Sequence, residues 1–392
     1  MRYADIKLVE SKILLNEAEA RIQHAEDLIF WEGSKGAVRA IEALKSLEQG
    51  KHTDVTIKWD GSPAIIFGRN DDGEFILTDK SGFAAVGYDG KAKSAKDLEA
   101  MFMARPGAKR DPEGFGQLAS NMRDIFDEYE KATPKDFRGY FKGDLLYFNT
   151  PEIENGRYHF TPNIVTYDVD VNSDLGKRIA KSKTAVVVHN MQDEEGNPSK
   201  LPDNINNFFQ GEEVFVVPPV TVSKAPQVEN NEITQLKSIV SKNAAAIDSM
   251  LNQNELVQKK MKSFPNVLYT YVNSKVDSGL ENLGADFMDW LQNRPQISGA
   301  AKKKIAEYIQ EHSAGFKAIW DTVSAIMRVK NDIIKQFDQH DADVKSSIGS
   351  KGPAKPETHG DGGEGYVMTH PKGDIKLVSR EYFSKANRSV ER

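Results

Sequence analysis

The secondary-structure pattern of this 392-residue chain changes twice along its length, and this limits the folds that it can adopt. From Thr53 to about Val222, short runs rich in β-branched and aromatic residues are separated by Gly, Asn, Asp and Pro, as strands are by turns. These runs are VTIKW, AIIFG, EFILT, YFKGDLLYF, NIVTYDVDV, TAVVVHN and EVFVVPPV. Helical spacing appears near Asp97–Met103 and Gln117–Ala132. The pattern predicts a body of mixed α+β class.

Helices are expected before and after this body. Residues 1–48 are predicted to be mostly helical, because apolar residues recur there at helical spacing. After about residue 229 the strand signal almost disappears. Apolar spacing then predicts a helix over 236–251, a short one over 287–291 and a long one over 305–337, broken near Gly315.

Strand character returns near the C-terminus in GYVMT and DIKLV, which HPKG separates as in a hairpin. We expect this pair to belong to the earlier β-rich body, so that the helical segment is inserted into a loop. The predicted regions are a helical segment packing on the core (1–52), the first part of the β-rich domain (53–228), a helical insert (229–345), and a linker with the returning strands (346–392). Glu364 and Lys376 would then approach Lys58.

Composition excludes several classes of protein. There is no cysteine, which rules out disulfides, thiolate metal sites and cysteine nucleophiles. The N-terminus has charges throughout and resembles neither a signal peptide nor a membrane span, so a cytoplasmic protein without a membrane partner is expected. The net charge of −6 argues against coating nucleic acid by charge alone, but allows a local basic cleft.

The stretch TIKWDGSP carries the first chemical signal. Lys58 follows a short β-rich run and precedes Asp60 and Gly61. One interpretation is a lysine on the rim of a hairpin. The other is a nucleophilic lysine at a strand end, with Asp60 to position it and Gly61 to let a ligand approach.

Five motifs in order resemble those of the covalent nucleotidyltransferases, which include ATP-dependent DNA ligases, RNA ligases and mRNA-capping enzymes. They are Lys58-Trp59-Asp60-Gly61, similar to KxDG; Phe141-Lys142-Gly143-Asp144-Leu145; Ile164-Val165-Thr166-Tyr167-Asp168-Val169; Glu364-Gly365-Tyr366-Val367, similar to EGxV; and Ile375-Lys376-Leu377. The resemblance spans residues 53–380 apart from the helical insert. It implies an ATP-grasp-like nucleotidyltransferase domain of antiparallel sheets with helices.

The resemblance also implies roles. Lys58 would attack the α-phosphate of ATP, and a second cation, Lys376, would lower the pKa of its amine. Asp60, Asp144 and Glu364 would hold Mg²⁺, with Mn²⁺ as an alternative ion. Lys58, Lys80, Tyr167, Glu364 and Lys376 would bind the nucleotide. Within this set Tyr167 would stack on adenine, and Lys80 or Ser81 would contact the ribose or a phosphate.

Simpler interpretations remain open for several residues. Asp144 can be a strand-end charge, and Tyr167 can be a core residue. Arg69 and Arg380 are expected at the surface. His189 can line the pocket or be structural.

Lysines of the helical insert provide candidate nucleic-acid contacts, although such runs are usually solvated helix faces. They are Lys259, Lys260, Lys302, Lys303 and Lys304.

Departures from the family pattern bear on the substrate. Pro63 stands where DNA ligases usually carry arginine, and the KxDGS and EGYV spellings resemble phage-type RNA ligases, which carry Glu more often than the Asp144 found here. The chain stops 16 residues after Lys376, so no C-terminal OB-fold domain is expected.

The sequence therefore predicts a monomeric ATP-dependent polynucleotide ligase that joins a 5′-phosphate to a 3′-hydroxyl, on DNA or RNA; a phage-encoded protein would act in the host cytoplasm. The alternatives are a non-catalytic nucleic-acid-binding protein of the same fold and a nucleotidyltransferase acting on another acceptor.

Overall fold

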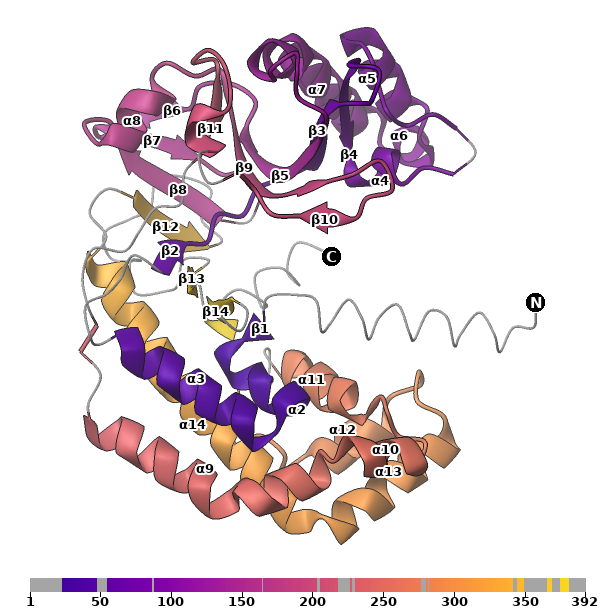
Figure 1. Cartoon of the computed structure of the whole chain (residues 1–392), viewed down its shortest axis with the longest axis vertical. Helices are drawn as coiled ribbons and strands as arrows, with labels where there is room; N and C mark the ends of the chain where they lie inside the picture. The colour runs from indigo at the N-terminus through magenta and orange to yellow at the C-terminus, as the bar shows by residue number, and fades with distance from the viewer. Residues whose placement is uncertain are drawn as a thin grey trace. The chain divides into compact units, whose positions relative to one another are not determined.

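A computed structural model of the chain divides it into two compact units. Unit 1 contains residues 1–58, 221–341 and 360–392, and unit 2 contains residues 59–220 and 342–359. The structure describes residues 23–47, 55–86, 88–163, 165–202, 205–217, 226–227, 230–275, 280, 282–340, 344–348, 365–368 and 374–380. Figure 1 shows the helices and strands of the chain with their labels.

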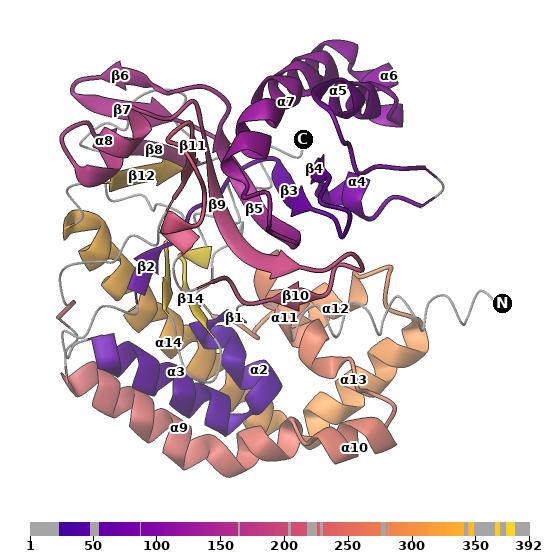
Figure 2. The same cartoon turned by 45° about the horizontal axis from the view of Figure 1, so that its top comes forward.

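Unit 2 is built on a six-stranded sheet. Its strand order is β10-β9-β5-β3-β4, and β11 also pairs with β9. The bounds are β3 Ala64–Arg69, β4 Phe75–Asp79, β5 Gly139–Tyr147, β9 Thr184–Gln192, β10 Pro198–Ser199 and β11 Val214–Val216. The pairs β3–β4, β3–β5, β5–β9 and β9–β10 are antiparallel, whereas β9–β11 is parallel. Figure 2 shows β5 and β9 running together as the longest strands of this sheet.

Both faces of this sheet are covered near β3 and β4. Helices α4 Lys80–Phe83, α5 Ala95–Met103, α6 Pro106–Arg110 and α7 Pro112–Ala132 follow these strands or separate them from β5. The main core joins Phe67 and Leu77 of the sheet to Met122 and Phe126 of α7. A smaller cluster on the other face includes Ile66 and Tyr140. Burial on both faces explains the nearly continuous apolar runs AIIFG and FILT.

A second sheet of unit 2 has the order β12-β8-β7-β6. Its strands are β6 Glu152–Glu154, β7 Arg157–Phe160, β8 Val165–Asp170 and β12 Val344–Ile348, and helix α8 Asp174–Ile179 follows β8. Strand β12 comes from the far side of the helical insert and pairs antiparallel with β8. Residues 346–348 were expected to belong to a linker, so this pairing differs from the prediction.

Arg69 corrects another expectation. It was predicted at the surface, but it is only 6% exposed. Its guanidinium donates to the carbonyl oxygens of Glu130, Thr133 and Pro134 at 3.1–3.2 Å. The Glu130 carbonyl lies in the last turn of α7, where helical N–H partners run out, and Thr133 and Pro134 follow directly after this helix. Arg69 is buried because it caps this helix.

Unit 1 combines a small sheet with helices. The sheet has the order β1-β14-β13-β2, with β1 Gln23–His24, β2 Val55–Ile57, β13 Tyr366–Met368 and β14 Ile375–Leu377. The helices are η1 Ala25–Asp27, α2 Leu28–Glu32, α3 Ser34–Leu47, α9 Asn230–Met250, α10 Gln253–Gln258, α11 Phe264–Ser274, α12 Phe287–Gln292, α13 Gly299–Glu311 and α14 Ser313–His340. A short 3-10 turn, η3 Ile205–Asn207, belongs to unit 2.

Helices α3, α9 and α14 lie against one another in unit 1 (Figures 1 and 2). At the start of α3, the Ser34 N–H and hydroxyl both donate to the Asp248 carboxylate of α9 at 2.7 Å. This carboxylate satisfies donors that the first turn of a helix leaves without partners. The N-terminal helices are thereby fixed to the helical insert.

The structure divides the chain differently from the predicted regions. The returning strands β13 and β14 form the predicted antiparallel hairpin pair. They join β1 and β2 in unit 1 with the helical insert, whereas the β-rich body from residue 59 forms unit 2. The predicted helices of the insert are confirmed, and the break in the long one falls at His312, between α13 and α14. The α+β class is confirmed at this coarse level.

None of the helices in the described ranges is long and apolar enough to cross a membrane.

A buried ionic cluster connects three segments of unit 1 that are distant in the sequence. Lys330 of α14 donates to both Glu26 carboxylate oxygens at 2.8 Å, and all of these atoms are buried. Arg380 contacts Glu26 at 3.3 Å and is paired with Asp27. Burial raises the pKa of Glu26, but the charges of Lys330 and Arg380 outweigh it and lower that pKa below its ordinary value. Arg380 is 1% exposed, so its predicted surface position was wrong: two buried carboxylates hold it inside.

We expect Lys330→Met to lower the free energy of unfolding by about 3–5 kcal/mol, because it leaves Glu26 buried with half of its compensating charge. Lys335→Met changes an exposed lysine of the same helix and should shift it by less than about 0.5 kcal/mol. Adding Glu26→Leu to Lys330→Met should restore part of the loss. Urea unfolding measures the free energy of unfolding of these three variants. Equal losses in Lys330→Met and Lys335→Met would contradict the assignment of Lys330 to the buried ionic cluster.

Candidate functional site

The strand that leads to Lys58 lies beside the strand of the EGxV-like motif. β2 pairs antiparallel with β13, so that Thr56 faces Val367. The Lys58 N–H extends this pairing by donating to the Gly365 carbonyl oxygen at 3.0 Å. The next strand, β14, carries Lys376. Three motifs separated by about 300 residues of chain are therefore neighbours in one sheet, and Lys58 does not lie on a hairpin with β3.

Lys376 and Lys58 share one face of this sheet. His24, Lys376, Val367 and Thr56 form a row of directly paired residues across the four strands. Their flanking residues on β2, β13 and β14 are buried, whereas Thr56, Val367 and Lys376 are half-buried. Because side chains alternate along a strand, Lys58 follows Thr56 on the same, more open face.

His24 also belongs to this group, although it was not predicted from the sequence. Burial is the largest cause that lowers the pKa of His24, and the charges of Arg380, Lys330, Lys376 and Lys58 lower it further. Lys376 and Lys58 therefore both act on the same imidazole. A histidine within an otherwise unremarkable N-terminal stretch gave no signal, since only the pairing of β1 with β14 brings it here.

The motif glycines have steric explanations. A Cβ on Gly61 would lie 2.4 Å from the Leu145 carbonyl oxygen, so the chain after Asp60 can approach β5 only without a side chain. Gly365 has φ +101°, and a Cβ there would lie 2.4 Å from the Leu377 carbonyl oxygen. Glu364, the predicted metal and nucleotide ligand before it, lies outside the described residues.

Asp60 and Asp144 are brought together in unit 2. The Ser62 N–H donates to the Leu145 carbonyl oxygen at 2.9 Å, which holds the segment after Asp60 against β5. The Asp60 carboxylate accepts a hydrogen bond from Asn163 at 2.8 Å, and Asp144 is hydrogen-bonded to His189 at 2.9 Å. Both carboxylates raise the pKa of the Tyr167 hydroxyl, after the larger effect of burial. Carboxylate oxygens of this kind suit Mg²⁺.

Tyr167 is fully buried, and its ring lies 4.7 Å from that of Trp59. Its hydroxyl oxygen accepts a hydrogen bond from the Asp60 N–H at 2.7 Å. This arrangement fits the interpretation of Tyr167 as a core residue that positions the motif loop, with the stacking role left as a proposal.

Lys80 and Ser81 are exposed at the start of α4. Asp79 before them caps this helix by accepting from the Gly82 N–H at 2.8 Å, and it is paired with Arg105 at 2.6–2.7 Å. The start of α4 is therefore fixed from two sides.

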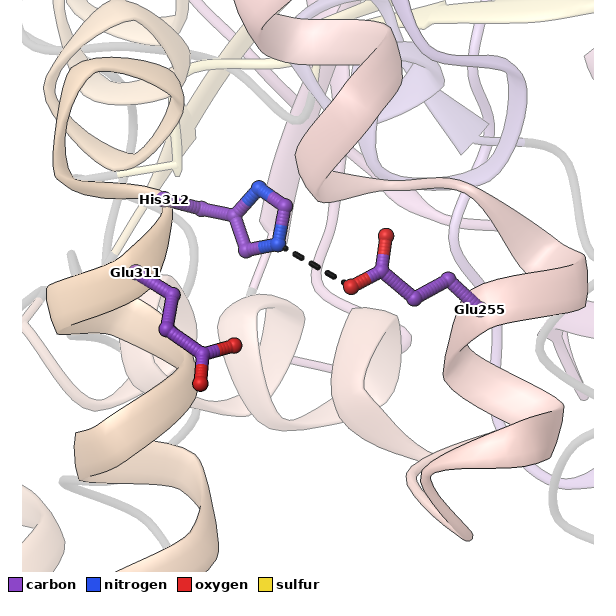
Figure 3. Close-up of side chains that lie close together, drawn as sticks. All are labelled: Glu255, Glu311 and His312. Atoms are coloured by element: carbon purple, nitrogen blue, oxygen red, sulfur yellow. Dashed lines mark hydrogen bonds and ion pairs between the residues drawn. The ribbon is translucent and has the colours of Figure 1, made fainter.

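The five lysines of the helical insert differ in their surroundings. The Lys259 ammonium is paired with Glu311 at 2.6 Å and lies 3.7 Å from Glu255. These carboxylates also surround His312, whose Nε2 lies 3.2 Å from Glu255 (Figure 3). Because the Lys259 ammonium already pairs with both carboxylates, we assign no metal site to this group.

Lys302 donates to the Gln292 carbonyl oxygen at 2.6 Å, and Lys303 lies 3.9 Å from Glu307. Lys260 and Lys304, in contrast, both line a cavity of about 270 Å³ between the starts of α11 and α13. No ion pair involves either of these two among the described residues.

The chain is thus a mixed α+β protein in which the small sheet of unit 1 brings two lysines to one face, and in which unit 2 gathers two aspartates. Residues 19–392 match the model of a family of unknown function, DUF6267, and the chain belongs to this family. No curated protein and no solved structure matches it.

We expect His24 to make the stability of unit 1 depend on pH. In the unfolded chain this imidazole takes up a proton below about pH 6.5, whereas the folded protein keeps it neutral. Its contribution is therefore complete above pH 6.5 and is lost as the pH falls below that value. Asp27 acts in the opposite sense, because burial raises its pKa to about 6. The effect of Asp27 is present both in the parent protein and in a His24→Asn variant, so it cancels when the two are compared.

Between pH 7 and pH 5.5, the free energy of unfolding should fall by about 1 kcal/mol more in the parent protein than in His24→Asn. Urea unfolding at several pH values tests this. Parallel pH profiles would show that His24 is not held neutral.

Proposed function

We propose that this protein is an ATP-dependent polynucleotide ligase in which Lys58 forms a covalent bond to AMP. The adjacency of the strands that lead to Lys58, Gly365 and Lys376 carries the proposal. Their sequences resemble three ordered motifs of the covalent nucleotidyltransferases, and a resemblance in sequence alone would not require these strands to pair. The fold proposed with this function is a nucleotidyltransferase domain of antiparallel sheets.

The first step uses Lys58, Lys376 in the same sheet, and Asp60, which is close to Lys58 in the sequence. Lys58 Nζ would attack the α-phosphorus of ATP, forming a P–N bond while the bond to the β-phosphate oxygen breaks and pyrophosphate leaves. The ammonium of Lys58 must first lose a proton. Lys376, on the same face, would offset negative charge that develops on the phosphate. Asp60 is two residues further on, which keeps the two Cα atoms within about 7 Å.

The acidic pair fits a divalent cation by its donor chemistry, because Mg²⁺ prefers carboxylate oxygens and retained waters. Asp60 and Asp144 of unit 2 would hold this ion. Mg²⁺ would supply charge neutralisation for the phosphates. Asn163 and His189 would keep the two carboxylates oriented through the hydrogen bonds described above.

Two further steps would complete joining. A 5′-phosphate oxygen of the polynucleotide attacks the phosphorus of lysyl-AMP, and the P–N bond breaks with return of the electron pair to Lys58. The 3′-hydroxyl then attacks the activated 5′-phosphate, loses its proton and displaces AMP. The helical insert, through Lys260 and Lys304, is the proposed contact with the nucleic-acid backbone.

Labelled ATP and Mg²⁺ should transfer AMP to the parent protein but not to Lys58→Arg, which keeps the charge and lacks a comparable nucleophile. Lys376→Ala and Glu364→Ala should slow the transfer about a hundredfold or more, the usual scale for losing a partner of transition-state charge. Lys345→Ala, a half-buried lysine outside the motifs, should transfer AMP normally. Retained label in Lys58→Arg would exclude Lys58 as the nucleophile.

Removal of Lys260 and Lys304 should weaken binding of nucleic acid and reduce its salt dependence. If each contacts one phosphate, the slope of log K against log salt should fall by about 1.4–1.8 in the double alanine variant. The matched control is Lys259→Ala/Lys303→Ala, which removes the same charge from residues that face carboxylates. Fluorescence anisotropy of a labelled strand provides the slopes. The same slope in both double variants would exclude this contact surface.

A further inference from the structure

Unit 2 contains a cavity that none of the motif residues lines. Its volume is about 590 Å³, within the range of sites for small organic ligands. It lies between the segment 88–93 and helix α5, near the start of α6. The lining residues are Tyr88, Asp89, Lys91, Ala92, Lys93, Asp97, Ala100, Met101, Ala104, Arg105 and Pro106.

The cations around this cavity already have carboxylate partners. Lys91 is paired with Glu194, Lys93 with Glu74 at 2.6 Å, and Arg105 with Asp79 through two hydrogen bonds of 2.6–2.7 Å. A phosphate group would have to compete with these carboxylates. An anion is therefore not the ligand that this lining favours.

Three polar groups of the lining remain available to a ligand: two carboxylate acceptors, Asp89 and Asp97, and one donor, the Nε–H of Arg105. Asp89 accepts from the Lys91 N–H at 3.0 Å, and Asp97 accepts from the Ser94 hydroxyl at 2.7 Å, each through one carboxylate oxygen. Within the described part of the chain, the other oxygen of each has no hydrogen-bond partner. The buried Nε–H of Arg105 also has none there. A buried donor without a partner is costly unless a ligand or water satisfies it.

The remaining lining is apolar and aromatic. Ala92, Ala100, Met101 and Ala104 present small or flexible apolar side chains, and the ring of Tyr88 is half exposed beside them. A flat heterocycle can place one face against such a surface and stack the other on an aromatic ring.

We propose that this cavity binds an unpaired nucleobase that carries an exocyclic amino group, in a single strand of nucleic acid. The amino group donates to Asp89 or Asp97, a ring nitrogen or carbonyl oxygen accepts from Arg105 Nε–H, and Tyr88 stacks on the base. Arg105 is bonded to Asp79, which directly precedes Lys80, the proposed ribose or phosphate contact. The inference rests on the proposed function and specifies its substrate: a strand with an unpaired base near the end to be joined.

Binding of short labelled oligonucleotides, measured by fluorescence anisotropy without ATP, tests the site. Oligo-A, oligo-C and oligo-U are compared with an AMP competitor and a blunt duplex. We expect tighter binding of oligo-A and oligo-C than of oligo-U, because uracil lacks the amino group. Tyr88→Ala and the cavity-filling Ala104→Leu should weaken oligo-A binding about five- to a hundredfold, the range for losing one stacked base. Asp97→Asn should reduce the preference for oligo-A over oligo-U.

Val86→Ala is the matched control, since Val86 is 95% exposed in the same segment and does not line the cavity. Circular dichroism and AMP transfer to Lys58 should be unchanged in all four variants. If the parent protein binds oligo-A and oligo-U equally, or Ala104→Leu binds oligo-A as the parent does, the inference is wrong. Displacement by AMP with no binding of oligonucleotides would also overturn it, since the occupant would then be a free nucleotide. Loss of AMP transfer in the parent protein would contradict the proposed function and not this site.

Discussion

The candidate site depends on hydrogen bonding between four strands of only two or three residues each. They come from residues 23–24, 55–57, 366–368 and 375–377, and each is too short to be stable without support. Their buried side chains, Ile57, Tyr366, Ile375 and Leu377 among them, face the interior of unit 1. The pairing places Lys58 and Lys376 on the opposite face. If this sheet did not form, no local feature of the chain would bring the two lysines together.

The ionic cluster behind the sheet explains how such short strands can be held. Arg380 follows β14, Glu26 follows β1, and Lys330 comes from the middle of the longest helix. Pairing these charges joins three distant parts of the chain, and leaving any of them unpaired in the interior would be costly. Burial, together with the charges of Arg380 and Lys330, keeps His24 neutral beside Lys376.

Local patterns in the sequence predicted many of the helices and strands. The division into units and the positions of several buried charged residues depend instead on long-range pairing. Helical spacing identified α9, α12 and α14, and the turn residues HPKG identified the β13–β14 hairpin. The division between units could not be predicted, because β2 pairs with a strand about 310 residues away and not with its neighbour β3. Arg69 and Arg380 were misplaced for a similar reason: their acceptors are carbonyls and carboxylates remote in sequence. One signal was overlooked, since Lys330 falls on the apolar stripe of Ile326, Ile333 and Phe337, where a lysine requires a buried carboxylate.

The sheet of unit 1 places the proposed nucleophile, Lys58, beside Lys376. The most direct test is to incubate the unmodified full chain with ATP and Mg²⁺, digest it, and locate any covalent AMP by peptide mass spectrometry. We expect one AMP per chain on the peptide that contains Lys58, bound through an acid-labile P–N bond. AMP on any other residue, or no adduct under conditions where ATP binding is demonstrated, would contradict this role of Lys58.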